Sequence, residues 1–247
     1  MKIFTILKRL KSKIISLILR YWIFSNHYNR DQFIINWLKK IDSNKSILDA
    51  GAGTQRYKQY CNHLDYISQD FGKYEGQETY FGGITDKWDS KSCDLICDIT
   101  KIPLEDQSVD AIMCTEVFEH LPNPAIALKE LSRILKVNGE ILVTSPFRSY
   151  YHQEPYFYYS GFSKYWYEYF ANDNNLEIVL IETSGNFLKE VGLDLVTILK
   201  LGGKLQTFIS LIFTIPYLIY LLIIEKIFKL KGPKSCWNYH VIMKKIQ

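Results

Sequence analysis

The feature that most constrains the fold is the segment ILDAGAGTQRY at residues 47–57. It predicts an apolar strand over residues 46–50, then a glycine turn, then a helix over residues 54–63. Gly51 and Gly53 in the turn let the backbone approach a ligand at a distance that a side chain would prevent. A buried strand that leads through such a turn into a helix is typical of nucleotide-binding α/β domains.

The glycine turn does not fit a nicotinamide dinucleotide. The GxGxxG pattern of that class needs a third glycine, so that helix and strand pack closely around the pyrophosphate. Arg56 occupies this position. The carboxylate of Asp49 lies within the loop, where it would repel a pyrophosphate and attract an α-ammonium group. The pattern therefore favours a cationic, amino-acid-like ligand.

Acidic residues end the next two predicted strands, 65–70 and 94–98. Asp70 follows the carboxylate of the glycine turn by 21 residues, a position from which it can accept two ribose hydroxyls. Asp98 can accept an exocyclic amine, and the backbone amide of Ile99 can donate to a ring nitrogen. These residues indicate a nucleoside binding site.

Strand and helix patterns alternate along the rest of the chain. Further strands are predicted at 109–115, 140–145, 176–183 and 237–243, helices at 124–136 and 161–172, and a loop with a short helix at 72–90. Such alternation predicts an α/β fold with a mostly parallel sheet and helices on both faces.

Residues 46–146 resemble a class I S-adenosylmethionine-dependent methyltransferase of the type 11 family. The resemblance is carried, in this order and spacing, by LDAGAGT, the strand end at Asp70, CDITKIPLEDQSVDAIMCTEVFEHLPNP and LKVNGEILVTSPF. It implies a Rossmann-like seven-stranded sheet with S-adenosylmethionine at the carboxyl ends of the strands. Gln55 stands where a third glycine often occurs, a departure that many members share.

The resemblance also implies a set of cofactor-binding residues. The glycines would lie under the methionine part of the cofactor, Asp70 on the ribose, Asp98 with Ile99 at the adenine, and Glu116 beside the cofactor. The full predicted set is Asp49, Gly51, Gly53, Asp70, Phe71, Asp98, Ile99 and Glu116.

Residues 145–166, SPFRSYYHQEPYFYYSGFSKYW, resemble a subgroup with a His-x-Glu-Pro element and hydrophobic helices before the last strand. Methyl transfer to a hydroxyl or phenol requires a base. The candidates are His152 and Glu154, in a loop where open α/β sheets place acceptor-binding residues, and His120. His152 is predicted as the base or as a ligand of the acceptor. The alternative is that each of the three satisfies backbone groups in its own loop.

Both ends of the chain are basic and apolar. Residues 1–40 carry a net charge of +8 and residues 200–247 carry +7, so a total of +4 leaves −11 for the middle. Residues 2–22 predict an amphipathic helix with separate apolar and basic stripes. Such ends suit an anionic membrane surface, whereas an acidic middle argues against nucleic acid as a partner.

Residues 205–224 contain no charged residue and are long enough to cross a bilayer. A single crossing is excluded if the strand at 237–243 joins the sheet, because the chain must return to the side that it left. A lysine-rich segment follows, and the positive-inside rule would place the main domain away from a cytosolic cofactor. A helical hairpin or interfacial helices are therefore favoured over a span, with a buried core helix as the alternative.

The predicted organisation has four parts: a basic amphipathic N-terminal region (1–40), the methyltransferase core (41–189), a hydrophobic helical insertion (190–232) and the last strand of the sheet (233–247). The five cysteines lack paired CxxC spacing, which predicts a reducing compartment and no metal site. The number of subunits is left open.

The expected function is methyl transfer from S-adenosylmethionine to a small or lipid-linked acceptor, such as a glycan or a quinone-like molecule. The acceptor would attack the sulfonium methyl in line, on an enzyme peripheral to the cytoplasmic face of a membrane. One alternative is a soluble small-molecule O- or N-methyltransferase whose hydrophobic helices form a lid or dimer interface. Another is a non-catalytic scaffold that binds the cofactor.

Overall fold

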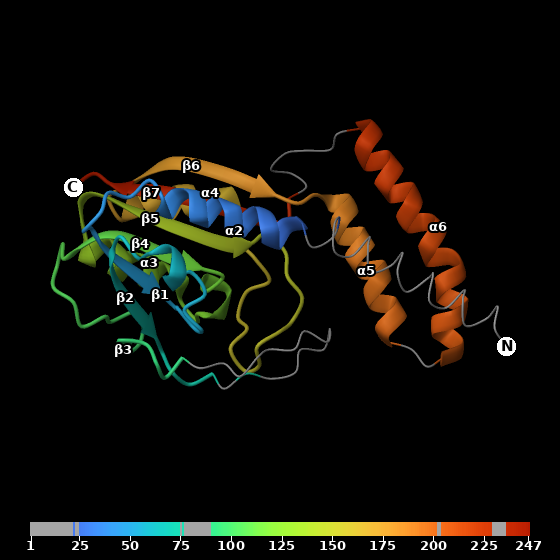
Figure 1. Ribbon diagram of the computed structural model, residues 1–247, viewed down its shortest axis with the longest axis horizontal. Coiled ribbons are helices and arrows are strands. Elements are labelled where there is room, and N and C mark those ends of the chain that lie inside the picture. The colour runs from blue at the N-terminus through green and yellow to red at the C-terminus, as the bar shows by residue number, and fades with distance from the viewer. Residues whose placement is uncertain (1–21, 23–24, 75, 77–89, 202–203, 229–235) are drawn as a thin grey trace. The chain divides into compact units, whose positions relative to one another are not determined.

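The computed structural model describes residues 22, 25–74, 76, 90–201, 204–228 and 236–247. The chain divides into two compact units (Figure 1). Residues 30–183 and 238–247 form the larger unit, which contains the sheet. Residues 1–29 and 184–237 form the smaller unit, which contains two hydrophobic helices.

The larger unit is built on a seven-stranded sheet of order β3-β2-β1-β4-β5-β7-β6 (Figure 1). The strands are β1 Ser46–Ala50, β2 Asp65–Asp70, β3 Leu95–Ile96, β4 Val109–Thr115, β5 Leu135–Pro146, β6 Leu176–Ser184 and β7 Asn238–Lys245. Strands β1 to β5 pair in parallel, and β7 pairs antiparallel to β5. The predicted seven-stranded, mostly parallel α/β sheet is therefore confirmed.

The central strands are buried on both faces because they are apolar at consecutive positions rather than at alternate ones. In β1, Ile47 and Leu48 are both fully buried, as are Ile112 and Met113 in β4. Ile47 and Met113 pack in one core cluster with residues of helix α2 (Ser25–Leu38). Their neighbours in sequence point to the opposite face of the sheet. Helix packing therefore fixes the ends of β1 and β4 in space.

Helix α3 spans Pro124–Ile134, and helix α4 spans Lys164–Asp173. Asn123 caps α3, because its side chain accepts a hydrogen bond from the backbone N–H of Ile126 at 3.4 Å. The sequence predicted that α3 would continue to residue 136, with Asn138 and Gly139 as the residues that stop it. The helix ends earlier because the chain enters β5 at residue 135.

The helix predicted over residues 54–63 does not form. Turns and a short 3-10 helix, η2 (Lys58–Tyr60), occupy this segment. Gln55 has a φ of +55°, outside the right-handed helical region, and its side-chain amide donates to the carbonyl oxygen of Ser92 at 3.1 Å. Tyr57 and Cys61 are still buried. The prediction of a helix in this segment is therefore wrong, because the conformation of Gln55 depends on a contact with a distant segment.

The smaller unit contains helices α5 (Phe187–Leu201) and α6 (Lys204–Phe228). Trp22, Leu188, Val196, Leu218 and Leu221 form its buried core. One polar side chain, Glu225, lies at the edge of this core. Its carboxylate accepts hydrogen bonds from the indole N–H of Trp22 and from the side-chain amide of Asn186.

The helix predicted over residues 2–22 lies outside the described residues except for Trp22, and so does most of the loop predicted at 72–90. Within the described parts of the chain, no helix combines the length and the apolar character needed to cross a membrane.

Candidate functional site

The glycine turn after β1 is held against the ends of neighbouring strands. The N–H of Gly51 donates to the side-chain oxygen of Gln69 at 3.2 Å, and the N–H of Gly53 donates to Oδ2 of Asp70 at 3.0 Å. Gly51 has a φ of +73°, and a Cβ there would lie 2.5 Å from Cγ2 of Val117. Both the backbone conformation and the available space therefore require glycine at this position.

Asp70 ends β2 beside the turn and is 5% exposed. Its Oδ1 accepts the N–H of Gly72 at 2.9 Å, and its Oδ2 accepts the N–H of Gly53. Each oxygen has a second lone pair, so the carboxylate can still accept hydroxyl donors. The backbone amides hold this carboxylate at the edge of the sheet where the resemblance places a ribose.

Asp49 is almost completely buried, and the hydroxyl of Tyr66 donates to its Oδ2 at 2.7 Å. Burial, with a smaller contribution from the charge of Asp70 and against the effect of the Tyr66 hydrogen bond, raises the pKa of Asp49 to about 7. The carboxyl is therefore partly protonated near neutral pH. A cationic ligand would favour its charged form.

The loop after β3 carries the two residues predicted at the adenine. It is anchored to β2, because the side-chain amide of Gln69 donates to the carbonyl oxygen of Cys97 at 2.7 Å. Asp98 is exposed, and its Oδ1 accepts hydrogen bonds from the N–H and the hydroxyl of Thr100, both at 2.8 Å. Ile99 is buried. The strand ends thus bring Asp98 into the same region as Asp70.

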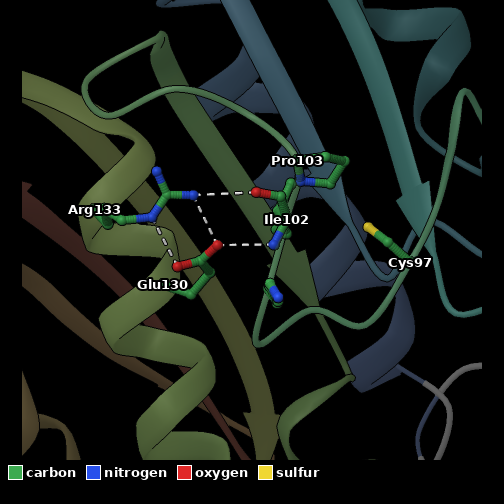
Figure 2. Close-up of a pocket in the computed structure, with 6 residues that line it drawn as sticks. Cys97, Ile102, Pro103, Glu130 and Arg133 are labelled. Atoms are coloured by element: carbon green, nitrogen blue, oxygen red, sulfur yellow. Dashed lines mark hydrogen bonds and ion pairs between the residues drawn. The ribbon is translucent and has the colours of Figure 1, made fainter.

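A hollow of about 430 Å³ lies beside this loop, and Figure 2 shows the residues that line it. They are Cys97, Lys101, Ile102, Pro103, Glu130 and Arg133. The guanidinium of Arg133 donates to the carboxylate of Glu130 at 2.8 Å and to the carbonyl oxygen of Ile102 at 3.1 Å. Glu130 also accepts the N–H of Ile102 at 2.7 Å. The side chains of Glu130 and Arg133 thus anchor the loop to α3 through their hydrogen bonds to Ile102. The hollow includes none of the predicted cofactor-binding residues.

Glu116 follows β4 with a φ of +54°. Arg30 lies 3.0 Å from its Oε2, and Asn238 and Thr144 donate to its carboxylate at 3.1 Å and 2.9 Å. These contacts tie the end of β4 to α2, β5 and β7. Glu116 is predicted from the sequence, whereas its partners Arg30 and Asn238 are not, because no local signal marks partners so far apart in the chain.

Two of the three predicted catalytic side chains lie together. His120, in the 3-10 helix η3 (Phe118–His120), and His152, in the loop after β5, have ring centroids 4.9 Å apart. Nδ1 of His120 lies 2.6 Å from the carbonyl oxygen of Tyr156, and Nδ1 of His152 lies 2.7 Å from that of Tyr150. Burial lowers the pKa of His120 to about 4 and also lowers the pKa of His152. Both rings are therefore neutral at pH 7.

A third group, Glu119, joins this pair without having been predicted. It is 1% exposed, and its Oε1 lies 3.8 Å from Nε2 of His120. Burial, with the negative charge of Glu116, raises the pKa of Glu119 well above its usual range. The EVFEH segment was visible in the sequence, but spacing alone does not show that its second glutamate is buried.

Glu154 lies apart from this cluster. Its side chain is exposed and forms a hydrogen bond with Tyr151. The structure therefore brings His120 and His152 together and leaves Glu154 at the surface of the same loop.

The loop that carries His152 also contacts Phe71, which is predicted to bind the cofactor. The ring of Tyr156 packs edge-on against Phe71, with centroids 4.9 Å apart. The N–H groups of Tyr158 and Tyr159 donate to the carbonyl oxygen of Glu119 at 3.0 Å and 3.2 Å. The loop thus connects the histidine pair to the residue that follows Asp70.

Residues 48–143 match a protein family described as a methyltransferase domain. This segment of the larger unit is similar to a type 11 methyltransferase domain, as the motifs predicted. Its cofactor is S-adenosylmethionine, as predicted from the motifs, and its activity is methyl transfer. A comparison with curated proteins gave no match.

Solved structures with the same methyltransferase fold have low sequence identity to this chain. YcgJ from Bacillus subtilis has a TM-score of 0.51 at 13% identity, covering 87% of this chain and 97% of that chain. A candidate sarcosine dimethylglycine methyltransferase from Galdieria sulphuraria has a TM-score of 0.50 at 14% identity, covering 90% of this chain and 85% of that chain. A candidate methyltransferase bound to the Trm112 activator of Haloferax volcanii has 0.50 at 14%, covering 95% of each chain. At these identities the likeness establishes the fold.

If Asp49 binds the α-ammonium group as predicted, its raised pKa should make the affinity for S-adenosylmethionine depend on pH. Below about pH 7 the free carboxyl is neutral and does not attract the α-ammonium group, so affinity is expected to fall as pH falls. We expect a loss of about tenfold between about pH 8 and about pH 6. Calorimetry on the wild type and on Asp49→Asn measures it. Asp49→Asn should lose this dependence of affinity on pH and keep only the dependence that comes from the amine of the cofactor. Equal pH dependence in the wild type and the variant would contradict the prediction that Asp49 binds the α-ammonium group.

Proposed function

We propose that the enzyme transfers the methyl group of S-adenosylmethionine to an acceptor at an anionic membrane surface. The acceptor would be lipid-linked or itself apolar, such as a lipid-linked glycan or a quinone-like molecule. The observation that carries this proposal is an exposed apolar face on helix α6.

This face consists of large side chains that are each between 45% and 72% exposed. They are Ile212, Phe213, Tyr217, Ile219, Tyr220, Ile223, Ile227 and Phe228. On the other side of the same helix, Leu218 and Leu221 are buried in the core of the smaller unit. An exposed apolar surface of this extent is typical of a site that contacts a membrane or a protein partner.

The charge of the chain favours the membrane. Lys226 is exposed in the last turn of α6, and residues 200–247 carry a net charge of +7. Residues 1–40 carry +8. Basic groups beside an apolar helix face add electrostatic attraction for anionic headgroups to the burial of apolar area. The contact proposed is peripheral and on the cytoplasmic face.

For the chemistry, the acceptor atom attacks the methyl carbon in line with the carbon–sulfur bond. Holding the reactants in line is worth about 7–11 kcal/mol in favourable cases. We place the acceptor against η3 and the loop that carries His152 and Glu154, with His120 as the third proposed catalytic residue. The proposed cofactor-binding residues remain Asp49, Gly51, Gly53, Asp70, Phe71, Asp98, Ile99 and Glu116.

Vesicle flotation tests the membrane contact. The wild type is expected to float with vesicles that contain an anionic phospholipid and to stay behind with neutral vesicles. Phe213→Glu and Ile227→Glu should each weaken binding by about tenfold or more, because each removes one large apolar contact. Tyr165→Glu is the matched control, because Tyr165 is a similarly exposed aromatic residue on α4.

All variants should retain calorimetric binding of S-adenosylmethionine, which reports an intact methyltransferase domain. A wild type that ignores anionic vesicles would contradict the proposal. A dimer in sedimentation that Phe213→Glu dissociates would instead assign the α6 face to a subunit interface, in a soluble small-molecule methyltransferase.

A further inference from the structure

Three side chains with metal-binding atoms converge beside the proposed acceptor loop. Glu119 and His120 lie on η3, and His152 comes from the loop after β5. One ligand atom from each lies within 4.8 Å of the others. The hydrogen bonds from Tyr158 and Tyr159 to Glu119 hold these two segments together.

Both imidazole rings have Nδ1 fixed by a contact with the backbone. Nδ1 of each ring lies within hydrogen-bonding distance of a backbone carbonyl oxygen, at 2.6 Å for His120 and 2.7 Å for His152. A carbonyl accepts but cannot donate, so each Nδ1 carries the ring proton. The lone pair of each neutral ring is therefore on Nε2. Metal-binding histidines are commonly fixed by such a contact through the second ring nitrogen.

Glu119 supplies an independent observation. Its side chain is 2% exposed, and its Oε2 is buried without a hydrogen-bond partner among the described residues. Its Oε1 lies 3.8 Å from Nε2 of His120, too far for a hydrogen bond. A buried carboxyl oxygen without a partner is costly, and a cation at the cluster would satisfy it.

We propose that Glu119, His120 and His152 bind one divalent transition-metal ion, for which zinc is the test case. The donor set of two imidazole nitrogens and one carboxylate oxygen suits such an ion better than Mg²⁺ or Ca²⁺, which prefer oxygen ligands. Ligand atoms around tetrahedral zinc lie about 3.3 Å apart. Metal binding would therefore draw the three side chains closer together. This site departs from the sequence expectation of no metal.

Three protein ligands leave a position open for an acceptor oxygen. A metal ion there would make an acceptor hydroxyl more acidic. The acceptor oxygen forms a bond to the methyl carbon while the carbon–sulfur bond breaks. The electron pair of the broken carbon–sulfur bond stays on sulfur, which gives S-adenosylhomocysteine. The hydroxyl proton leaves to solvent. This role rests on the proposed function, whereas metal binding does not.

Metal titration of the full chain, after treatment with a chelator, tests the site. Zn²⁺ should bind at one equivalent by calorimetry, and X-ray absorption should report nitrogen and oxygen ligands at about 2.0–2.1 Å. Glu119→Gln and His152→Ala should each weaken Zn²⁺ binding by more than about 100-fold. His63→Gln is the matched control, because His63 contacts the carbonyl oxygen of Leu38 instead.

Binding of S-adenosylmethionine shows that each variant is folded. Absence of saturable Zn²⁺ binding in the wild type, or equal binding in the wild type and both variants, would overturn the site. Zn²⁺ binding that both variants lose supports the site even if the protein ignores anionic vesicles, because the two experiments alter different residues. Vesicle binding without Zn²⁺ binding would overturn the site and leave the membrane proposal intact.

Discussion

Replacing Asp70 by asparagine is expected to lower the affinity for S-adenosylmethionine by at least about 100-fold. The carboxylate is predicted to accept charge-assisted hydrogen bonds from two ribose hydroxyls, and each such bond is worth about 1.5–3 kcal/mol. The variant also disturbs the site itself. The N–H groups of Gly53 and Gly72 donate to different oxygens of Asp70, so the NH2 group of asparagine would leave one of them without its acceptor. Calorimetric titration measures the loss.

Asp65→Asn is the matched control for this experiment. Asp65 begins the same strand that Asp70 ends, and its side chain is exposed. The control should bind S-adenosylmethionine as the wild type does. If Asp70→Asn also bound like the wild type, the ribose would have to be held elsewhere.

The second large effect is expected for Gly51→Ala, which should lower the free energy of unfolding by about 2–5 kcal/mol. An L-residue at a φ of +73° is strained, and the new methyl group would lie 2.5 Å from Cγ2 of Val117. Cofactor binding should weaken as well, because the turn must move. Urea denaturation measures the stability.

The double variant Gly51→Ala with Val117→Ala separates the two causes. It relieves the side-chain clash and keeps the backbone strain. The two substitutions together should therefore destabilise the protein by about 1–3 kcal/mol less than the sum of their separate effects. A single Gly51→Ala variant within about 0.5 kcal/mol of the wild type would contradict the described turn.

The sequence predicted the central strands to the residue. The bounds of β1, β2 and β4 agree with the apolar runs at 46–50, 65–70 and 109–115. Each run is short and ends in glycine or polar residues, so its limits are set locally. Because the carboxyl ends of parallel strands share one edge, the pattern also placed Asp49, Asp70 and the glycine turn together.

What the sequence did not predict depends on contacts between distant segments. The backbone at Gln55 leaves the helical region where its side chain reaches Ser92, although the apolar spacing is helical. The pairing of Arg30 with Glu116 also has no local signal. The surroundings of Glu119 likewise depend on a distant loop, whose residues Tyr158 and Tyr159 donate to its carbonyl oxygen from about 40 residues further along the chain.

The most direct test of the account follows a labelled methyl group. Wild-type protein is incubated with S-adenosylmethionine that carries a radioactive methyl group, together with lipid and aqueous extracts of the source cells, and the two phases are then separated. The account predicts label in the lipid phase, lost in Asp70→Asn and reduced in Phe213→Glu. Label confined to the aqueous phase would contradict the membrane acceptor. If the protein binds the cofactor but transfers no label to either extract, the result would contradict methyl transfer itself.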